Sequence, residues 1–198
     1  GPIPTDTSAP GGSEQDPEDI WQAVATAVRR SLEQLRHPVD VLAVAIAAQS
    51  GSVVPVCRDA TSSPAVTWMD TRSRPLVDTW TESAVARIRA ASGWSPSPGL
   101  GLATISWLLD AGGGGSSADR WASVDDFLLH RLGGDWTTNP SNAAGMQLMD
   151  VAALEWSVEL CTRCGVEPAQ LSRIVSSGTD VGCVGRDAAA ATGISPRA

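Results

Sequence analysis

The longest unbroken apolar stretch of this 198-residue chain covers the eight residues from Val41 to Ala48. That length suits a β-strand and is far too short to cross a membrane as a helix. A strand with no polar residue on either side of its pleat is typical of a sheet that other elements cover on both faces. The run therefore predicts an α/β fold in which residues 41–48 form a buried strand.

A strong helix signal precedes this run. Asp16 can cap a helix, Pro17 suits its first position, and Glu18 and Asp19 place negative charge in its first turn. Apolar residues then recur at helical spacing, at Ile20, Val24, Val28, Leu32 and Leu35. We expect a helix that begins at Pro17 and stops before residues 37–38, where a proline follows His37.

The remaining pattern predicts further strands and helices in one domain. Strands are expected over 52–57, 65–68 and 181–184, and Pro55 suggests an edge strand or a bulge. Helices are expected from Asp70 to Ala91 and over 102–110, 119–132, 151–164 and 187–192, with a flexible glycine-rich connection at 112–115. The second half of the chain is thus largely helical.

Charge and composition exclude several classes of function. The chain has 22 acidic residues against 14 basic ones, so a surface for nucleic acid or for an anionic membrane is not expected. All the basic residues are arginine, and a chain without lysine has no Walker-type phosphate loop, Schiff base or lysine general base. Leu, Ile, Val and Phe together number only 41, and eight tryptophans add the apolar area that a core needs.

The cysteines and the first residues bear on the cellular compartment. Residues 1–5 have neither the basic nor the apolar region of a secretory signal, so we expect a cytoplasmic protein with reduced thiols. Cys161 and Cys164 have the spacing of a metal or redox pair, but His37 and His130 lack the spacing of further zinc ligands. Packing on one helix face is the favoured interpretation, and a zinc or redox role is the alternative.

Polar residues follow two of the predicted strands. In open α/β sheets, ligands bind just beyond the carboxyl ends of strands. An amide, an indole and an Asp–Arg pair suit the recognition of a polyhydroxylated molecule. In the alternative interpretation, Asp70 caps a helix and pairs with Arg72, and Trp68 lies in the core. The candidate substrate-binding residues are Gln49, Ser50, Gly51, Trp68, Asp70 and Arg72.

A series of motifs in a fixed order extends this interpretation. The segments are 14–21, 44–51, Trp68-x-Asp70-x-Arg72, 124–133 and 138–143, followed by Asp150, Trp156 and Leu171. In this order they resemble the N-terminal domain of the FGGY carbohydrate kinases, which include xylulokinase, glycerol kinase and gluconokinase. The resemblance covers nearly the whole chain.

The resemblance implies an incomplete ribonuclease H-like, actin-like ATPase domain of the FGGY N-terminal type over residues 1–198. The family passes the γ-phosphoryl group of Mg-ATP to a hydroxyl of a sugar or polyol, with an aspartate as base. The family's first phosphate-loop hairpin is expected before residue 1, and the catalytic aspartate and the nucleotide-binding domain after Ala198. The resemblance therefore implies no catalytic residue in this chain and no ATP or Mg²⁺ bound by it alone.

The resemblance leaves the substrate open. It places the 49–51 loop and Trp68 at the sugar site, yet glycerol kinases have Arg and Glu where this chain has Ser50 and Gly51, and xylulokinases have Met-His in this region. Gly99 stands where glycerol kinases have tyrosine, and Thr104 where the family has lysine. An unassigned sugar or polyol is the expected substrate. The alternative is a non-catalytic remnant that acts as a sugar-binding or protein-interaction module.

One expectation concerns self-association. If the family's first hairpin is missing, the edge of the sheet that contains residues 41–48 is unpaired. An unpaired edge offers its backbone groups to another chain. We therefore expect a homo-oligomer or poor solubility.

Overall fold

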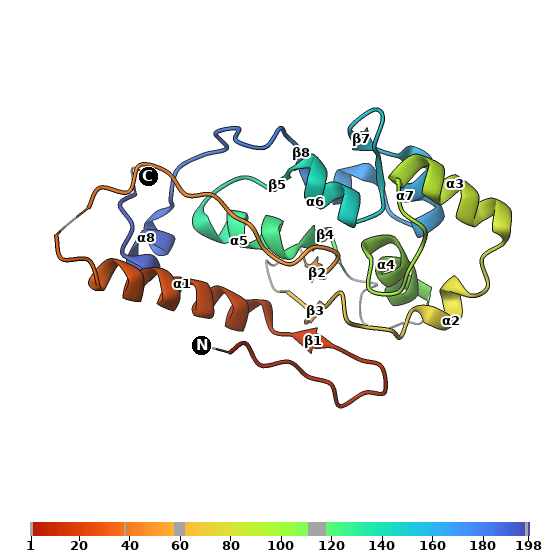
Figure 1. The fold of residues 1–198 in the computed structure, drawn as a ribbon, viewed down its shortest axis with the longest axis horizontal. Coiled ribbons are helices and arrows are strands. Elements are labelled where there is room, and N and C mark those ends of the chain that lie inside the picture. Colours follow the sequence, from red (N-terminus) through yellow and green to blue (C-terminus); the bar gives the residue numbers. More distant parts are fainter. Residues whose placement is uncertain (1, 38, 58–61, 111–117, 197) are drawn as a thin grey trace.

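The computed structural model describes residues 2–37, 39–57, 62–110, 118–196 and 198 (Figure 1). Its helices are α1 (Pro17–Glu33), α2 (Arg74–Val77), α3 (Glu82–Ser92), α4 (Gly101–Asp110), α5 (Val124–Leu132), α6 (Pro140–Gly145), α7 (Val158–Cys164) and α8 (Arg186–Thr192), with a 3-10 turn, η2, at Pro168–Gln170. Its strands are β1 (Glu14–Gln15), β2 (Val53–Val56), β3 (Ala65–Val66), β4 (Arg120–Ser123), β5 (Thr137–Thr138), β6 (Met149–Asp150), β7 (Glu155–Trp156) and β8 (Arg173–Ile174).

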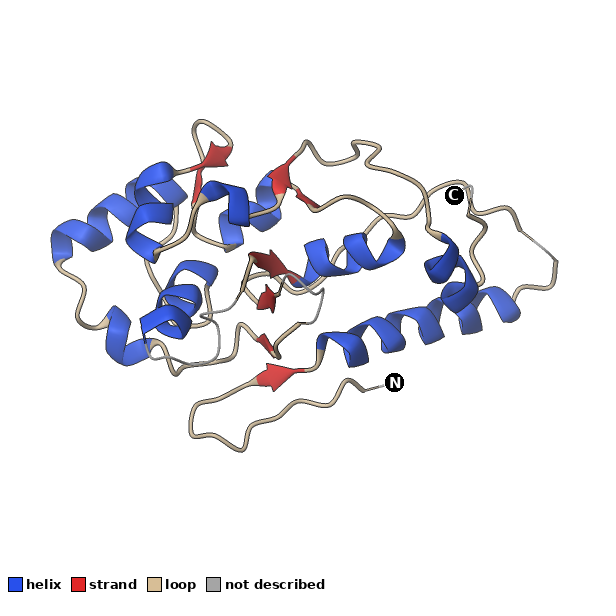
Figure 2. Cartoon of the chain, turned by 180° about the vertical axis from the view of Figure 1, so that it is seen from behind, coloured by secondary structure: helices blue, strands red, loops and turns tan. Residues whose placement is uncertain are grey.

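The centre of the molecule is a sheet in the order β1-β3-β2-β4, with all neighbours antiparallel. In Figures 1 and 2 its short strands lie between two groups of helices. One group contains α1, α5 and α8, and the other contains α3, α4 and α7. The parallel pair β5–β8 and the antiparallel pair β6–β7 lie outside this sheet.

Each face of the sheet borders its own hydrophobic core. Val54 packs in a cluster with Ile20 and Trp21 of α1, whereas its neighbour Val53 packs in a second cluster with Ile105 of α4 and Trp121. Successive side chains of a strand point to opposite faces, so the single strand β2 serves both cores. Helices on both faces of the sheet confirm the mixed α/β prediction.

The first helix agrees with its sequence signals. Asp16 is the N-cap, and its side chain accepts a hydrogen bond from the backbone N–H of Glu18. Ile20, Trp21 and Ala25 are its buried apolar residues. The helix ends at Glu33, however, so Leu35 lies beyond it and is 47% exposed.

The prediction of a buried strand over residues 41–48 is wrong. These residues have no regular secondary structure, and Leu42 is 82% exposed. Val41 and Ile46 pack at the margin of the α1-side core, and the backbone of Ala48 is hydrogen-bonded to Asp125. A strand exists only if a neighbour satisfies its backbone groups, and no β-pairing among the described residues includes this run. The apolar pattern of this run was not sufficient to predict a strand.

Several element predictions in the second half need correction. Residues 120–123 form β4 and not the start of a helix, because Ser123 and Asp126 make a capping box that begins α5 at Val124. The helix expected over 151–164 is shorter, since a turn at 151–154 and the strand β7 occupy its first part and α7 begins at Val158. Residues 181–184 form no strand, and the glycine-rich segment 112–115 lies outside the described residues.

Two corrections concern the first half. The helix expected from Asp70 to Ala91 is divided into α2 and α3, and Thr81 caps α3 by accepting the N–H of Ala84. Pro55 lies in an interior strand, because β2 pairs with both β3 and β4. The carbonyl of Pro55 accepts a hydrogen bond from Ser63, so the missing N–H, which points the same way, loses no bond to β4.

A buried polar network joins α5 to α6. The carboxylate of Asp126, only 4% exposed, accepts the N–H of Ser123 and the side-chain amide of Asn142, each at 3.2 Å. The same Asn142 amide donates to the hydroxyls of Ser123 and Thr138 at 2.6 and 2.9 Å. Burial raises the pKa of Asp126, and its hydrogen bonds only partly oppose this effect.

This raised pKa predicts the sign of a pH effect. Because the folded pKa of Asp126 lies above its unfolded value near 3.8, the unfolded chain releases the proton first as pH rises. Stability from this group is complete below the unfolded pKa and is lost as pH rises through the folded pKa. Asp126→Asn cannot titrate, so its free energy of unfolding should fall less between about pH 4 and pH 8. Urea unfolding across this range measures the difference.

The exposed Asp19 of α1 provides the control for this experiment. Asp19→Asn makes the same substitution at an exposed position, so it shows what the change from Asp to Asn does outside a buried network. Parallel curves for Asp126→Asn and the unmodified chain would contradict the prediction.

Candidate functional site

The 49–51 loop and the loop after β3 lie side by side. A Cβ atom built on Gly51, where φ is +85°, would lie 3.5 Å from the Cβ of Trp68. The hydroxyl of Ser52 accepts the backbone N–H of Trp68 at 3.1 Å. The structure thus brings Gln49, Ser50 and Gly51 together with Trp68, although the strand expected before this loop is absent.

Two glycines from distant segments complete the floor of this surface. A Cβ on Gly99, where φ is +77°, would lie 2.0 Å from the carbonyl oxygen of Trp68. A Cβ on Gly145 would lie 2.1 Å from the hydroxyl oxygen of Ser50. The two glycines therefore let the chain approach the backbone of Trp68 and the side chain of Ser50 closely. The dipeptide Pro98-Gly99 is typical of a turn, but the sequence does not indicate that this turn packs against Trp68.

The side chains above this floor are polar or aromatic. Trp68 and its neighbour Met69 are 53% and 51% exposed, so the interpretation of Trp68 as a core residue is wrong. Ser50 is exposed, and the half-buried Gln49 donates its amide N–H to the side-chain oxygen of Gln15 at 3.1 Å. We call Gln49, Ser50, Gly51, Trp68 and Met69 the Trp68 surface.

Asp70 and Arg72 form a separate ion-pair cluster with Glu14, which we call the Asp70 clamp. Asp70 is 2% exposed and accepts three hydrogen bonds at 2.9 Å, from the N–H of Ser13, the N–H of Arg72 and the Nε of Arg72. The Nη2 of Arg72 lies 2.5 Å from a carboxylate oxygen of Glu14. The guanidinium also stacks over Trp107 at 4.5 Å.

The clamp keeps Arg72 charged and ties Ser13 and Glu14 to the loop after β3. Burial disfavours the charged guanidinium, but hydrogen bonds to Asp70 and Glu14 outweigh it and raise the pKa of Arg72. The predicted Asp70–Arg72 pairing is confirmed, whereas the N-cap of α2 is Ser73 and not Asp70. Asp70 and Arg72 thus follow the Trp68 surface in the chain with their charges already paired.

The two neighbouring cysteines belong to a core. Cys161 and Cys164 are buried between α4 and α7, and burial raises the pKa of Cys161 to about 11 and that of Cys164 to about 12. Metal binding and thiol exchange both need the thiolate, which such environments disfavour. The geometry therefore supports the packing interpretation of this pair.

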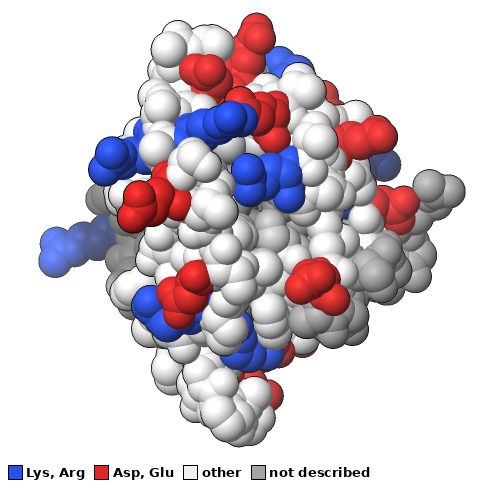
Figure 3. Space-filling view, turned by 90° about the vertical axis from the view of Figure 1, so that its right-hand side faces the viewer, with Lys and Arg blue, Asp and Glu red and all other residues white. Residues whose placement is uncertain are grey.

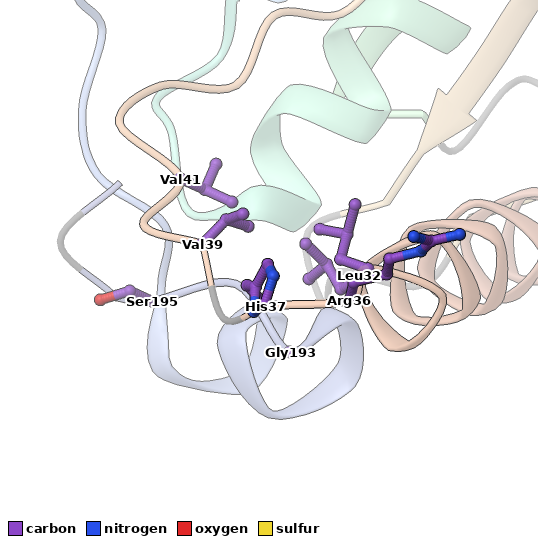
Figure 4. Close-up of a pocket in the computed structure, with 8 residues that line it drawn as sticks. Leu32, Arg36, His37, Val39, Val41, Gly193 and Ser195 are labelled. Carbon is purple, nitrogen blue, oxygen red and sulfur yellow. The ribbon is translucent and has the colours of Figure 1, made fainter.

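A hollow of about 460 Å³ lies between the C-terminal part of α1, the segment after it and the end of α8. In Figure 4, Val39 and Val41 lie on one side of it and Leu32 and Arg36 on the other. It contains none of the residues predicted from the sequence to bind substrate, so it is not the candidate site. Its lining consists of Leu32, Leu35, Arg36, His37, Val39, Val41, Gly193 and Ser195.

No group of three or more His, Cys, Asp or Glu side chains within the described ranges is placed to hold a metal ion.

Two observations describe the charge distribution and the apolar character of the helices. On the face shown in Figure 3, acidic and basic side chains of the described residues alternate and form no extended basic patch. Within the described ranges, no helix combines the length and the apolar character that a membrane crossing needs.

A sheet covered by helices on both faces, with an exposed indole beside a polar loop at one end of its strands, defines a mixed α/β domain. The whole chain, residues 1–198, matches the N-terminal domain of the FGGY family of carbohydrate kinases. The chain therefore belongs to this family.

Individual relatives agree with this assignment. The chain is 28% identical over 177 residues to a glycerol kinase of Thermococcus onnurineus, a match that covers 85% of the chain and 36% of that protein. Crystal structures of a gluconate kinase and of a ligand-bound xylulose kinase, both from Lactobacillus acidophilus, superpose with TM-scores of 0.93 and 0.92. Each is 20% identical, and each match covers all of this chain and 40% of the other. The chain has the ribonuclease H-like, actin-like ATPase fold of these kinases and spans about two fifths of their length.

Proposed function

We propose that this chain supplies the sugar-side surface of an ATP-dependent kinase that phosphorylates a hydroxyl group of a sugar or polyol. The observation that carries the proposal is the half-exposed indole of Trp68, seated against the polar 49–51 loop in a domain of the FGGY family. A large aromatic side chain is left exposed at a folding cost, since burial of apolar area stabilises a domain. Ligand sites combine aromatic side chains with a few placed polar groups, and Trp68 with Gln49 and Ser50 provides such a combination.

The role of this surface is binding and orientation. The indole face of Trp68 packs against the apolar C–H face of a sugar, while Gln49 and Ser50 exchange hydrogen bonds with its hydroxyl groups. The close backbone contacts at Gly51 and Gly99 hold these side chains at fixed positions. Phosphoryl transfer depends mainly on positioning and on neutralising charge, so a rigid acceptor surface contributes directly to the rate.

The proposal divides the chemistry between parts of a longer enzyme. ATP and Mg²⁺ supply the transferred phosphoryl group and its charge neutralisation in the complete kinase. This chain alone should therefore release no ADP in the presence of a sugar.

A non-catalytic sugar-binding or protein-interaction module is the competing function. The adjacent coding sequence separates them, because an in-frame nucleotide-binding half indicates a kinase and stop codons on both sides indicate the module. The cytoplasmic location and the homo-oligomer remain predictions, but the unpaired edge of a 41–48 strand no longer supports the homo-oligomer, because these residues form no strand.

Trp68→Ala tests the proposed surface. Because Trp68 is half-exposed, the free energy of unfolding should change by less than about 1 kcal/mol, while sugar affinity should fall at least about tenfold. Calorimetric titration with glycerol, xylulose and gluconate measures affinity, and urea unfolding measures stability.

Trp94→Ala is the matched control, since Trp94 is 55% exposed but follows α3 outside the Trp68 surface. Its sugar affinity should equal that of the unmodified chain. Equal affinities for Trp68→Ala and the unmodified chain would remove the sugar-binding role of Trp68.

A further inference from the structure

An exposed apolar patch lies at the turn between β6 and β7. Residues 151–154 of this turn are Val-Ala-Ala-Leu, and all four are exposed. Trp94, which is 55% exposed, lies beside them, since a Cβ atom built on its neighbour Gly93 would be 3.8 Å from a methyl carbon of Val151. Figure 1 shows this turn at the edge of the molecule, next to α3. We call Trp94 and residues 151–154 the Trp94 patch. An exposed run of four apolar residues is unusual in a folded domain unless it serves a function.

Backbone strain gathers at the same place. Among the described residues, the two non-glycine residues with a positive φ are Gln147, at +57°, and Leu154, at +58°. Leu154 belongs to the patch and is 51% exposed. Gln147 is fully buried below it, and its side-chain amide donates to the carbonyls of Trp94 and Ser95 at 3.4 and 3.1 Å. Strained positions of this kind cluster at functional sites, because a folded domain otherwise has no reason to retain them.

Hydrogen bonds hold the patch in one conformation. The carboxylate of Asp150 accepts the backbone N–H groups of Ala152 and Ala153 at 2.9 and 3.1 Å, and its carbonyl accepts the N–H of Leu154 at 2.8 Å. Because the turn is already ordered, binding through it costs little conformational entropy. An exposed tryptophan on an ordered backbone is typical of the residues that contribute most to protein–protein contacts.

The charges in and around the patch identify the partner. The patch itself contains no charged residue, so a partner that placed a charge against it would lose water without gaining a counter-ion. Its border has both signs, since Glu155 follows the run directly and Arg87 of α3 forms an exposed ion pair with Glu159 of α7 at 3.5 Å. An uncharged apolar centre with a border of both signs is complementary to itself across a twofold axis.

We propose that the Trp94 patch is the contact surface between two copies of this chain in a twofold dimer. The patch gives the expected homo-oligomer a surface other than the 41–48 run. It contains no residue of the Trp68 surface, so the proposal stands independently of sugar binding.

Leu154→Gly tests the proposal by separating association from folding. Glycine adopts a φ of +58° without strain, so the free energy of unfolding of the monomer should not fall. Loss of the exposed side chain should raise the dissociation constant of the dimer at least about tenfold. Analytical ultracentrifugation over a concentration series measures this constant, and urea unfolding below it measures the monomer. Trp94→Ala is the second variant and should also weaken the dimer at least about tenfold.

Leu42→Gly is the matched control, since it makes the same substitution at a residue of the 41–48 run that is 82% exposed. It should leave the dissociation constant unchanged. Added salt should lower this constant in the unmodified chain, because each copy has a net charge of −8 and salt screens the repulsion between them.

Each other outcome overturns the proposal. A chain that stays monomeric up to its solubility limit shows that the patch has a different partner. A dimer that Leu154→Gly and Trp94→Ala leave unchanged has its contact elsewhere, and one that only Leu42→Gly weakens has it at the 41–48 run. A loss of monomer stability in Leu154→Gly would show that this side chain serves the fold and not the contact.

Discussion

Gly99→Ala is expected to destabilise the domain by about 3 to 5 kcal/mol. Gly99 has φ of +77°, a conformation that costs an alanine about 1 to 2 kcal/mol. The new methyl group would also lie 2.0 Å from the backbone oxygen of Trp68, a distance that no rotamer change can relieve. Relief requires separating the 97–101 segment from the loop after β3, so sugar binding should weaken as well.

Gly178→Ala is the matched control for this experiment. Gly178 has φ of +83°, but a Cβ there would meet no atom within 4 Å. Its substitution should therefore cost only the conformational strain of about 1 to 2 kcal/mol. Urea unfolding of both variants gives the difference between their free energies of unfolding, which measures the cost of the steric contact alone. Equal losses of stability would show that Gly99 and Trp68 do not pack as described.

The elements that the sequence predicts correctly are those with local determinants. The cap at Asp16 and the proline at position 17 lie within the first turn of α1 itself, so the start of this helix follows from a few neighbouring residues. The mixed α/β class is also correct, although the apolar run over residues 41–48 from which it was predicted forms no strand. The start of α1 is thus predicted without information about distant partners.

The wrong predictions concern elements whose partners are distant in sequence. Residues 41–48 have the pattern of a strand, but β-pairing depends on a neighbour that no local pattern identifies. β4 shows the converse error. Its residues were predicted to be helical, but they pair with β2, more than 60 residues earlier. Strand formation is decided by such pairing as much as by intrinsic propensity.

The candidate site shows the same division. The rule that binding residues gather beyond strand ends singled out the 49–51 loop and Trp68, but the strand expected before the loop is absent. The two segments meet because the loop precedes β2, Trp68 follows β3, and Val53 pairs with Val66. The close approach of Gly99 was not predicted, since it joins segments about 30 residues apart. Glu14 was also missed as a partner of Arg72, because the two residues lie 58 positions apart in the sequence. Its sequence context indicated only the segment before a helix.

Asp70→Ala should cost about 3 to 4 kcal/mol, because it leaves two buried donors and one charge incompletely paired. The N–H of Ser13 loses its acceptor, and Arg72 retains only Glu14. The segment that contains Ser13 and Glu14 should then loosen from the loop after β3, so sugar affinity should fall together with stability. Asp78→Ala, at an exposed residue after α2, is the control and should change stability by less than about 0.5 kcal/mol.

Two measurements on Asp70→Ala decide between a structural and a direct role for this carboxylate. If Asp70 acts through the clamp, urea unfolding shows the full loss of stability, and Asp70→Asn, which retains an acceptor oxygen, recovers part of both stability and affinity. If Asp70 contacts the sugar itself, affinity falls while the unfolding transition stays unchanged. The 2% exposure of Asp70 and its three hydrogen bonds favour the first result. In that case Trp68 carries the contact with the sugar, and Asp70 holds the loop on which it stands.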